Sequence, residues 1–146
     1  MNDAFNRNSE GRDAGACLIL AKKLMRGRGA ARNYEAAARW FDLAAQAGSA
    51  DAFYWLGKLY LKGLGVPKDP GGAASCFEHA ANQGHAAAQW YLGECFETGK
   101  GVPRSCELAG YWYRKSAARG EERAFAALLR LAGKGPGMIS CPRSDH

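Results

Sequence analysis

The sequence has few of the residues from which disulfide frameworks and metal centres are built. It contains five cysteines in 146 residues, and no two of them form a CxxC pair. An odd number of cysteines at irregular spacing argues against a disulfide framework, so we expect buried free thiols. Cys76 and His79 can share one helical face, but two ligands do not make a zinc site. We therefore expect neither a metal nor a cofactor.

Long apolar runs are also missing. The longest, residues 16–21, is far too short to cross a bilayer. The first thirteen residues lack the positively charged start and the apolar core of a secretory signal. We expect a cytoplasmic protein without a membrane span, unless a leader preceded this sequence.

Imidazoles are scarce, with only His79, His85 and His146 available as bases. No nucleophile with a base, no paired carboxylates and no metal cluster can be assembled from the pattern. The glycine-rich stretches GLGVPKD and GKGVPRS match neither a P-loop nor a dinucleotide-binding loop. We expect no catalytic residues and no enzyme activity.

Basic residues outnumber acidic ones, and the formal net charge is +6. They are spread from Arg7 to Arg143 instead of forming one tract, which is typical of a charge-mixed surface. The excess nevertheless supports an alternative function, a basic surface for nucleic acid or for an anionic membrane or cell-envelope component. The scattered charge makes nucleic acid the less favoured of these partners.

What the sequence does contain is a period of 36 residues. The matching sets are Gly27, Gly63 and Gly99; Gly48, Gly84 and Gly120; Ala45, Ala81 and Ala117; Leu20, Leu56, Leu92 and Leu128; and Phe41, Phe77 and Tyr113. A fixed period of this length indicates stacked supersecondary units. The period predicts repeats at 14–49, 50–85 and 86–121, and a half repeat at 122–134. Residues 1–13 and 135–146 lack the pattern, and we expect them to be flexible.

Each repeat is predicted to contain two antiparallel helices. In the second repeat, Phe53, Leu56 and Tyr60 follow the spacing of one apolar helical face. Gly63 stands where a left-handed residue ends a helix, and a polar residue then caps the next one. The predicted caps, one per repeat, are Asn33, Asp69 and Ser105.

These residues resemble a known family. The run ADAFYWLGKLY at 50–60, followed by GLGVPKD at 63–69, resembles the SEL-one-like repeat (SLR), a relative of the tetratricopeptide repeat. Further matches are AAAQWYLG at 86–93, GKGVP at 99–103, AAQAG at 44–48 and AANQGH at 80–85. The first repeat departs from the pattern, with Gly29-Ala30-Ala31 in place of the Gly-Val-Pro turn.

The resemblance implies an all-α, right-handed solenoid of about three and a half helix pairs whose concave surface holds partners. Members of the family look like adaptors and scaffolds in protein complexes, in signalling and in bacterial host-interaction or envelope processes. Some cysteine-rich relatives have carried β-lactamase labels, but their regular cysteine pair per repeat is missing here. The resemblance also assigns His85 to the turn between repeats, in a structural role. We therefore expect an adaptor for a protein or peptide, with a homo-oligomer through the uncovered half repeat as a further contact.

The inner wall of such a solenoid is lined by one face of each first helix. Trp55 and Tyr91 stand out there, because the family usually has a polar residue at that position, and both types are common in binding hot spots. Packing between repeats is the alternative role for them, and the favoured one for Tyr54 and Trp90. Arg123 has an equivalent place in the half repeat.

Cations share this face with the rings. Lys22, Lys58 and Arg130 form a row that can attract an acidic peptide, although a solvated face explains such charges as simply. The predicted partner-binding residues are Trp55, Tyr91, Lys22, Lys58, Lys62, Glu94 and Arg130.

Overall fold

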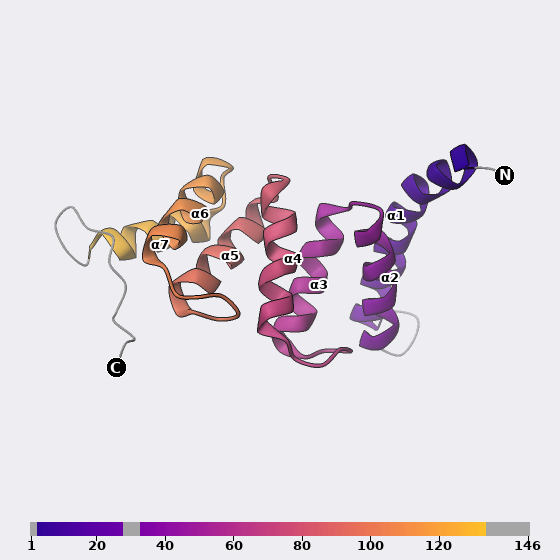
Figure 1. Cartoon of the computed structure of the whole chain (residues 1–146), viewed down its shortest axis with the longest axis horizontal. Helices are drawn as coiled ribbons and strands as arrows, with labels where there is room; N and C mark the ends of the chain where they lie inside the picture. Colours follow the sequence, from indigo (N-terminus) through magenta and orange to yellow (C-terminus); the bar gives the residue numbers. More distant parts are fainter. Residues whose placement is uncertain (1–2, 28–32, 134–146) are drawn as a thin grey trace.

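The computed structural model describes residues 3–27 and 33–133, with side chains from residue 14 onward. Within these ranges the chain forms seven helices and no strand (Figure 1). They are α1 (Asp3–Arg26), α2 (Tyr34–Gln46), α3 (Ala50–Lys62), α4 (Pro70–Asn82), α5 (Ala86–Thr98), α6 (Cys106–Ala118) and α7 (Glu122–Ala132). The predicted all-α class is confirmed.

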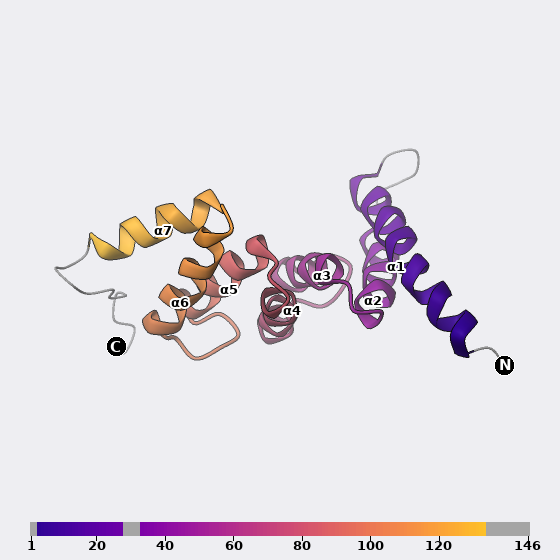
Figure 2. The same cartoon turned by 90° about the horizontal axis from the view of Figure 1, so that it is seen from above.

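The helices form consecutive pairs that stack along one axis. α1 packs on α2, α3 on α4 and α5 on α6, and each pair also contacts the next one. Viewed from above, the pairs follow an arc with α1 and α7 at its two ends (Figure 2). Because the extensive contacts all join helices that are neighbours in sequence, the chain is a solenoid in which each repeat depends on the adjacent ones.

The helix boundaries follow the period. Helices α3, α5 and α7 begin at Ala50, Ala86 and Glu122, the first residues of the predicted second, third and half repeats. The first helix differs, because α1 starts at Asp3 and the segment predicted as flexible is helical from there. No proline interrupts residues 3–13, so nothing in the local sequence stops the helix. The predicted tail at 135–146 lies outside the described residues.

Capping residues fix the start of each second helix. The side chains of Asn33, Asp69 and Ser105 accept hydrogen bonds from backbone N–H groups three residues ahead, at 3.0, 3.0 and 3.1 Å. They satisfy donors that have no partner inside the helix. Gly63 and Gly99 end α3 and α5 in the left-handed conformation. The three caps predicted from the sequence are confirmed.

An aromatic ring from the second helix fills a notch in the first helix of the same repeat. Phe77 and Tyr113 are fully buried, and each lies against a glycine. A Cβ atom added to Gly57 would lie 2.7 Å from the Phe77 ring, and one added to Gly93 would lie 2.7 Å from the Tyr113 ring. The two helices therefore approach each other more closely than any larger residue at these positions permits.

A second glycine contact sets the spacing between repeats. The loop after α3 runs so close to the start of α2 that a Cβ at Gly65 would overlap the backbone of Tyr34. The loop after α5 repeats this contact, since a Cβ at Gly101 would overlap the backbone of Pro70. Each loop therefore rests directly on the first turn of the second helix of the preceding repeat.

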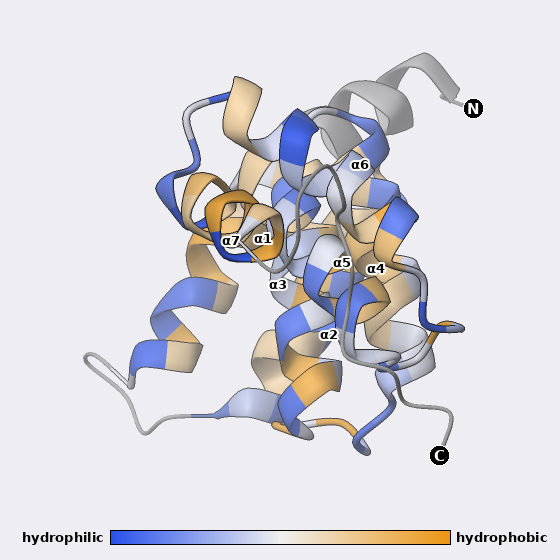
Figure 3. Ribbon diagram, turned by 90° about the vertical axis from the view of Figure 1, so that its left-hand side faces the viewer, coloured by the Kyte–Doolittle hydropathy of each residue, from blue (hydrophilic) through white to orange (hydrophobic). Residues whose placement is uncertain are grey.

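Helix α7 lacks the notch. Leu129 stands 36 residues after Gly93 and is 73% exposed, and Phe125 beside it is 54% exposed. Figure 3 views the molecule from this end and shows the apolar residues of α7 in orange. No second helix packs on this face within the described part of the chain. Association of two copies through it stays a prediction.

The cysteines meet the expectation only in part. Cys76 is half-buried and Cys95 is buried, both as free thiols. Cys106, in contrast, is disulfide-bonded, so the prediction of free thiols is wrong for this residue. It is the first residue of α6, at a helix end that a second sulfur can approach, whereas Cys95 lies on a core face. None of the described helices combines the length and apolar composition needed to cross a membrane.

The glycine notch can be tested with two matched substitutions. We expect Gly57→Ala to destabilise the fold by roughly 1–3 kcal/mol relative to Gly15→Ala, because only the former forces a methyl group against a packed ring. Both changes raise helix propensity by about 1 kcal/mol, and nothing lies within 4 Å of the site of a Gly15 Cβ. Urea unfolding followed by circular dichroism measures the difference. Equal stability of the two variants would contradict the notch.

Candidate functional site

Four first helices bring aromatic rings and cations onto one surface. Lys22 comes from α1, a central group from α3, two rings from α5 and Arg123 from α7, so the surface spans every repeat (Figure 2). We call this set the aromatic–cationic row. Its members are Lys22, Tyr54, Trp55, Lys58, Trp90, Tyr91 and Arg123.

Lys58 is the centre of the row. Its Nζ lies 4.6 Å from the centre of the Trp55 ring, 5.3 Å from that of Tyr54 and 5.8 Å from that of Tyr91. Ring faces attract a cation electrostatically without neutralising its charge. Within the described part of the chain, Lys58 makes no ion pair. Its charge therefore stays available to an anion that approaches the surface.

The rings of the row also pack between repeats. Trp55 stacks on Phe41 with ring centres 6.1 Å apart, and Tyr91 stacks on Phe77 at 5.0 Å. Each thus rests on the buried aromatic residue of the preceding repeat, which is the packing role that the sequence left open. Both rings are nevertheless only half-buried. The packing orients them, and the uncovered area is still available for a partner.

Tyr54 joins the two middle repeats. Its ring centre lies 5.2 Å from that of Trp55 and 5.8 Å from that of Tyr91. Burial raises the pKa of Tyr54, while the nearby Arg123 acts in the opposite direction. The sequence favoured a packing role for Tyr54 and Trp90 and left them out of the binding surface. The only signal that could have included them is the recurrence of adjacent aromatic residues at 54–55 and 90–91.

At the α7 end, a cation lies over the last rings. The Arg123 guanidinium is 4.2 Å from the centre of the Trp90 ring and 5.6 Å from that of Tyr91. Its Nε donates to Glu121 at 2.7 Å. This hydrogen bond raises the pKa of Arg123 and lowers that of Glu121. Arg123 is therefore paired with an acidic residue of the same chain, whereas Lys58 has no such partner within the described residues.

Arg130 belongs to a different contact. Its Nη2 donates to Glu97 at 3.0 Å, and a second guanidinium nitrogen binds the other carboxylate oxygen. The Tyr113 hydroxyl donates to Glu97 at 2.7 Å, and burial with this hydrogen bond raises the Tyr113 pKa. Glu97 is only 8% exposed. Arg130 thus fastens α7 to α5, and its predicted part in partner binding stays a prediction.

Glu94 takes the place of a lysine in the third repeat. It stands 36 residues after Lys58 and is half-buried beside a cavity of about 210 Å³ that Tyr91 and Lys100 also line. Burial and the neighbouring Glu97 raise its pKa. Lys62, the remaining predicted residue, is exposed at the end of α3. The surface therefore carries a negative group where the second repeat carries Lys58.

His85 has the structural role expected of it. Its Nδ1 accepts a hydrogen bond from the Ala88 N–H at 3.1 Å and so caps α5. In the neutral ring the proton must then be on Nε2, which donates to Asp51 at 2.9 Å. The ring also stacks on Tyr54 with centres 4.6 Å apart. Asp51 is therefore engaged with His85.

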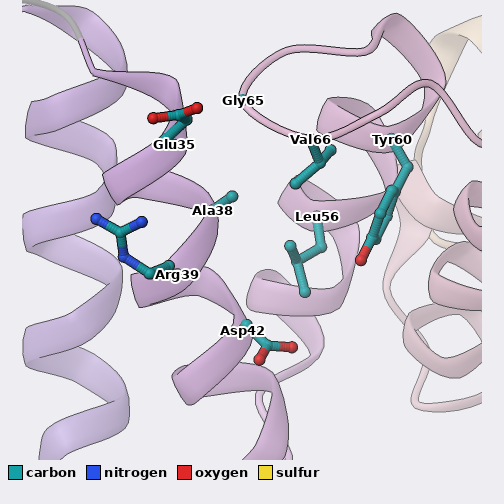
Figure 4. Close-up of a pocket in the computed structure, with 8 residues that line it drawn as sticks. All are labelled: Glu35, Ala38, Arg39, Asp42, Leu56, Tyr60, Gly65 and Val66. Carbon is teal, nitrogen blue, oxygen red and sulfur yellow. The ribbon is translucent and has the colours of Figure 1, made fainter.

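A second candidate site lies between α2 and α3. This open cleft has a volume of about 370 Å³, and in Figure 4 Leu56 and Val66 point across it toward α2 while Arg39 extends away. Tyr60 borders the cleft, and burial raises its pKa. Burial also raises the pKa of the nearby Cys76 to about 11, so this thiol is protonated at neutral pH and a poor nucleophile. The row, with its clustered half-buried rings and cations, is the better candidate for binding.

The contact between Arg130 and Glu97 can be measured by a double-mutant cycle. We expect Arg130→Met and Glu97→Gln to show a coupling free energy of about 1 kcal/mol, because Glu97 is nearly buried while Arg130 stays open to screening by solvent. Urea unfolding of the two single variants and the double variant provides the measurement. Strictly additive effects would mean that the pair does not hold α7 in place.

Comparisons with known proteins match this architecture. The Sel1 repeat family model matches residues 14–49, 50–85 and 86–121. A Sel1 repeat protein from Oxalobacter formigenes is 34% identical with a TM-score of 0.75, over 89% of this chain and 99% of that one. The protective antigen c5321 of uropathogenic Escherichia coli, which displays an SLR fold, is 31% identical with a TM-score of 0.85. That match covers 92% of this chain but only 29% of the antigen.

A more distant structure shares the fold alone. Cysteine rich protein B of Helicobacter pylori is 20% identical with a TM-score of 0.66, over 86% of this chain and 96% of that one. No curated protein matches the sequence significantly.

Proposed function

Since the chain belongs to the Sel1 repeat family, we propose that it is a scaffold whose aromatic–cationic row binds a segment of a partner protein. Proteins built from these repeats are generally protein-interaction scaffolds. The observation that carries the proposal is the clustering of four half-buried rings on adjacent first helices.

The physical basis is the hot-spot character of these side chains. Large, rigid rings lose little conformational entropy on binding, and Trp and Tyr dominate the energetics of many interfaces. Trp55 and Tyr91 are already fixed by stacking on Phe41 and Phe77. A partner therefore gains contact area without having to order these side chains, which favours binding through pre-organisation.

Binding without catalysis is part of the same proposal. The histidine nearest the row, His85, uses both ring nitrogens in structural contacts. Burial raises the pKa of the Cys95 thiol to about 11, so the reactive thiolate is scarce at neutral pH. Arg123 and Glu121 are engaged with each other. These groups support a recognition surface and give no reacting centre.

The proposal is tested by removing the rings while keeping their apolar bulk. We expect the Trp55→Leu, Tyr91→Leu double variant to bind its partner at least about tenfold more weakly, because leucine still packs on the core but has no ring face. Quantitative affinity purification from the source organism, with wild type and variant in parallel, measures the loss. Tyr111→Leu is the matched control, since Tyr111 is an exposed ring on α6, outside the row.

Circular dichroism must show that the double variant keeps its helices. Partner recovery equal to wild type, with that fold intact, would contradict binding at the row.

A further inference from the structure

Resting on the proposed function, we propose that the row selects an acidic segment of the partner. Its carboxylates contact Lys22 and Lys58, and its following uncharged residues lie over Tyr91 and Trp90. The chemical class of the ligand is therefore a peptide whose acidic residues precede an apolar stretch, bound in one register across α1, α3 and α5.

The first argument is the uneven pairing of the cations. At the α1–α3 end, Lys22 and Lys58 lie over ring faces, 5.8 and 4.6 Å from the centre of Trp55, and neither forms an ion pair within the described residues. At the α7 end, Arg123 and Arg130 are bound to carboxylates of the chain itself. Among these four cations, the two without a carboxylate partner therefore lie on the first two repeats.

The second argument concerns Asp51, the acidic residue on the same helix as Lys58. Among the described residues its carboxylate accepts a hydrogen bond from His85 at 2.9 Å and forms no ion pair with either lysine. Both cations lie beside ring faces, which attract them without supplying a negative counter-ion. An acidic side chain of a partner supplies the missing counter-ion.

The third argument sets the register. The positions equivalent to Lys58 at intervals of 36 residues are Lys22, Glu94 and Arg130, and Glu94, which lines a cavity together with Tyr91, reverses the sign in the third repeat. A carboxylate of the partner placed over α5 meets a like charge, which disfavours it. The rings of Trp90 and Tyr91 beside it favour an apolar or aromatic side chain instead.

This arrangement fits a peptide better than a nucleic acid. A nucleic-acid strand carries a negative charge at every nucleotide, so it requires cations along its whole path. The row has unneutralised cations at one end, and Glu94, Glu97 and Glu121 near the other. The acidic residues near the α7 end therefore disfavour a nucleic-acid strand, which is negatively charged along its whole length.

The experiment uses the purified full chain and fluorescence anisotropy. The probe is a fluorescein-labelled twelve-residue peptide of six glutamates followed by leucines and serines. A second peptide has glutamine in place of every glutamate, and a third has twelve glutamates. We expect the first peptide to bind most tightly, its affinity to fall as salt is raised, and the glutamine peptide to bind at least about tenfold more weakly.

Variants locate the contact. The Lys22→Gln, Lys58→Gln double variant is expected to lose at least about tenfold in affinity for the first peptide, while Lys115→Glu leaves it unchanged. Lys115 is the matched control because it also lies over a ring, 5.4 Å from the centre of Tyr111, but on α6. Glu94→Gln is expected to tighten binding of the all-glutamate peptide, since a like charge is removed. This gain cannot result from a damaged fold.

Three results would overturn the inference: equal binding of the glutamine and glutamate peptides, equal losses in the Lys22/Lys58 and Lys115 variants, or tighter binding of a twelve-nucleotide oligothymidine than of any peptide. These outcomes are separate from the failure of the scaffold function. If no acidic peptide binds, but a partner is still recovered in a manner that depends on Trp55 and Tyr91, acidic selection is wrong and the scaffold function stands. If partner recovery also does not depend on Trp55 and Tyr91, the acidic selection and the scaffold function at the row are both wrong.

Discussion

The structure depends on the close approach of paired helices at the glycine notch. Phe77 occupies the notch at Gly57 on one side, and the half-buried Tyr91 stacks on it at 5.0 Å on the other. The same buried ring therefore closes one repeat and supports the aromatic–cationic row of the next. Because rings packed this tightly have little freedom to move, the position of the surface follows from the packing of the core.

Positions that are equivalent in the 36-residue period make different charged contacts in the structure. Lys58 and Arg130 are two periods apart, yet Lys58 lies among rings and Arg130 binds the nearly buried Glu97. Helix α7 packs its apolar side on α6 but has no second helix of its own within the described chain, and Arg130 adds a polar contact to α5. The cations in the row and beside it are thus paired with carboxylates at the α7 end, while Lys22 and Lys58 form no ion pair within the described residues.

Local features of the fold were predictable from the sequence. The three caps and the starts of α3, α5 and α7 depend on residues within a few positions of each other, so a 36-residue period fixes them. Contacts between repeats were not predictable from the sequence. Tyr54 meets Tyr91, and Arg123 meets Trp90, only at the rotation that one repeat takes relative to the next. The disulfide at Cys106 was likewise invisible in the spacing of the cysteines.

This division indicates where the specificity of a repeat protein is encoded. Residues that recur at the same position of the second and third repeats, such as Leu56 and Leu92, are buried and build the stack, whereas Leu20 in the first repeat is 42% exposed. A ligand that contacts several repeats cannot obtain its register from these recurring residues, because they are the same in each repeat. It must obtain it from positions where the period is broken, and the change from Lys58 to Glu94 is such a break beside the row. In the proposed binding mode, the exchange of this single charge sets the register of the partner while leaving the architecture untouched.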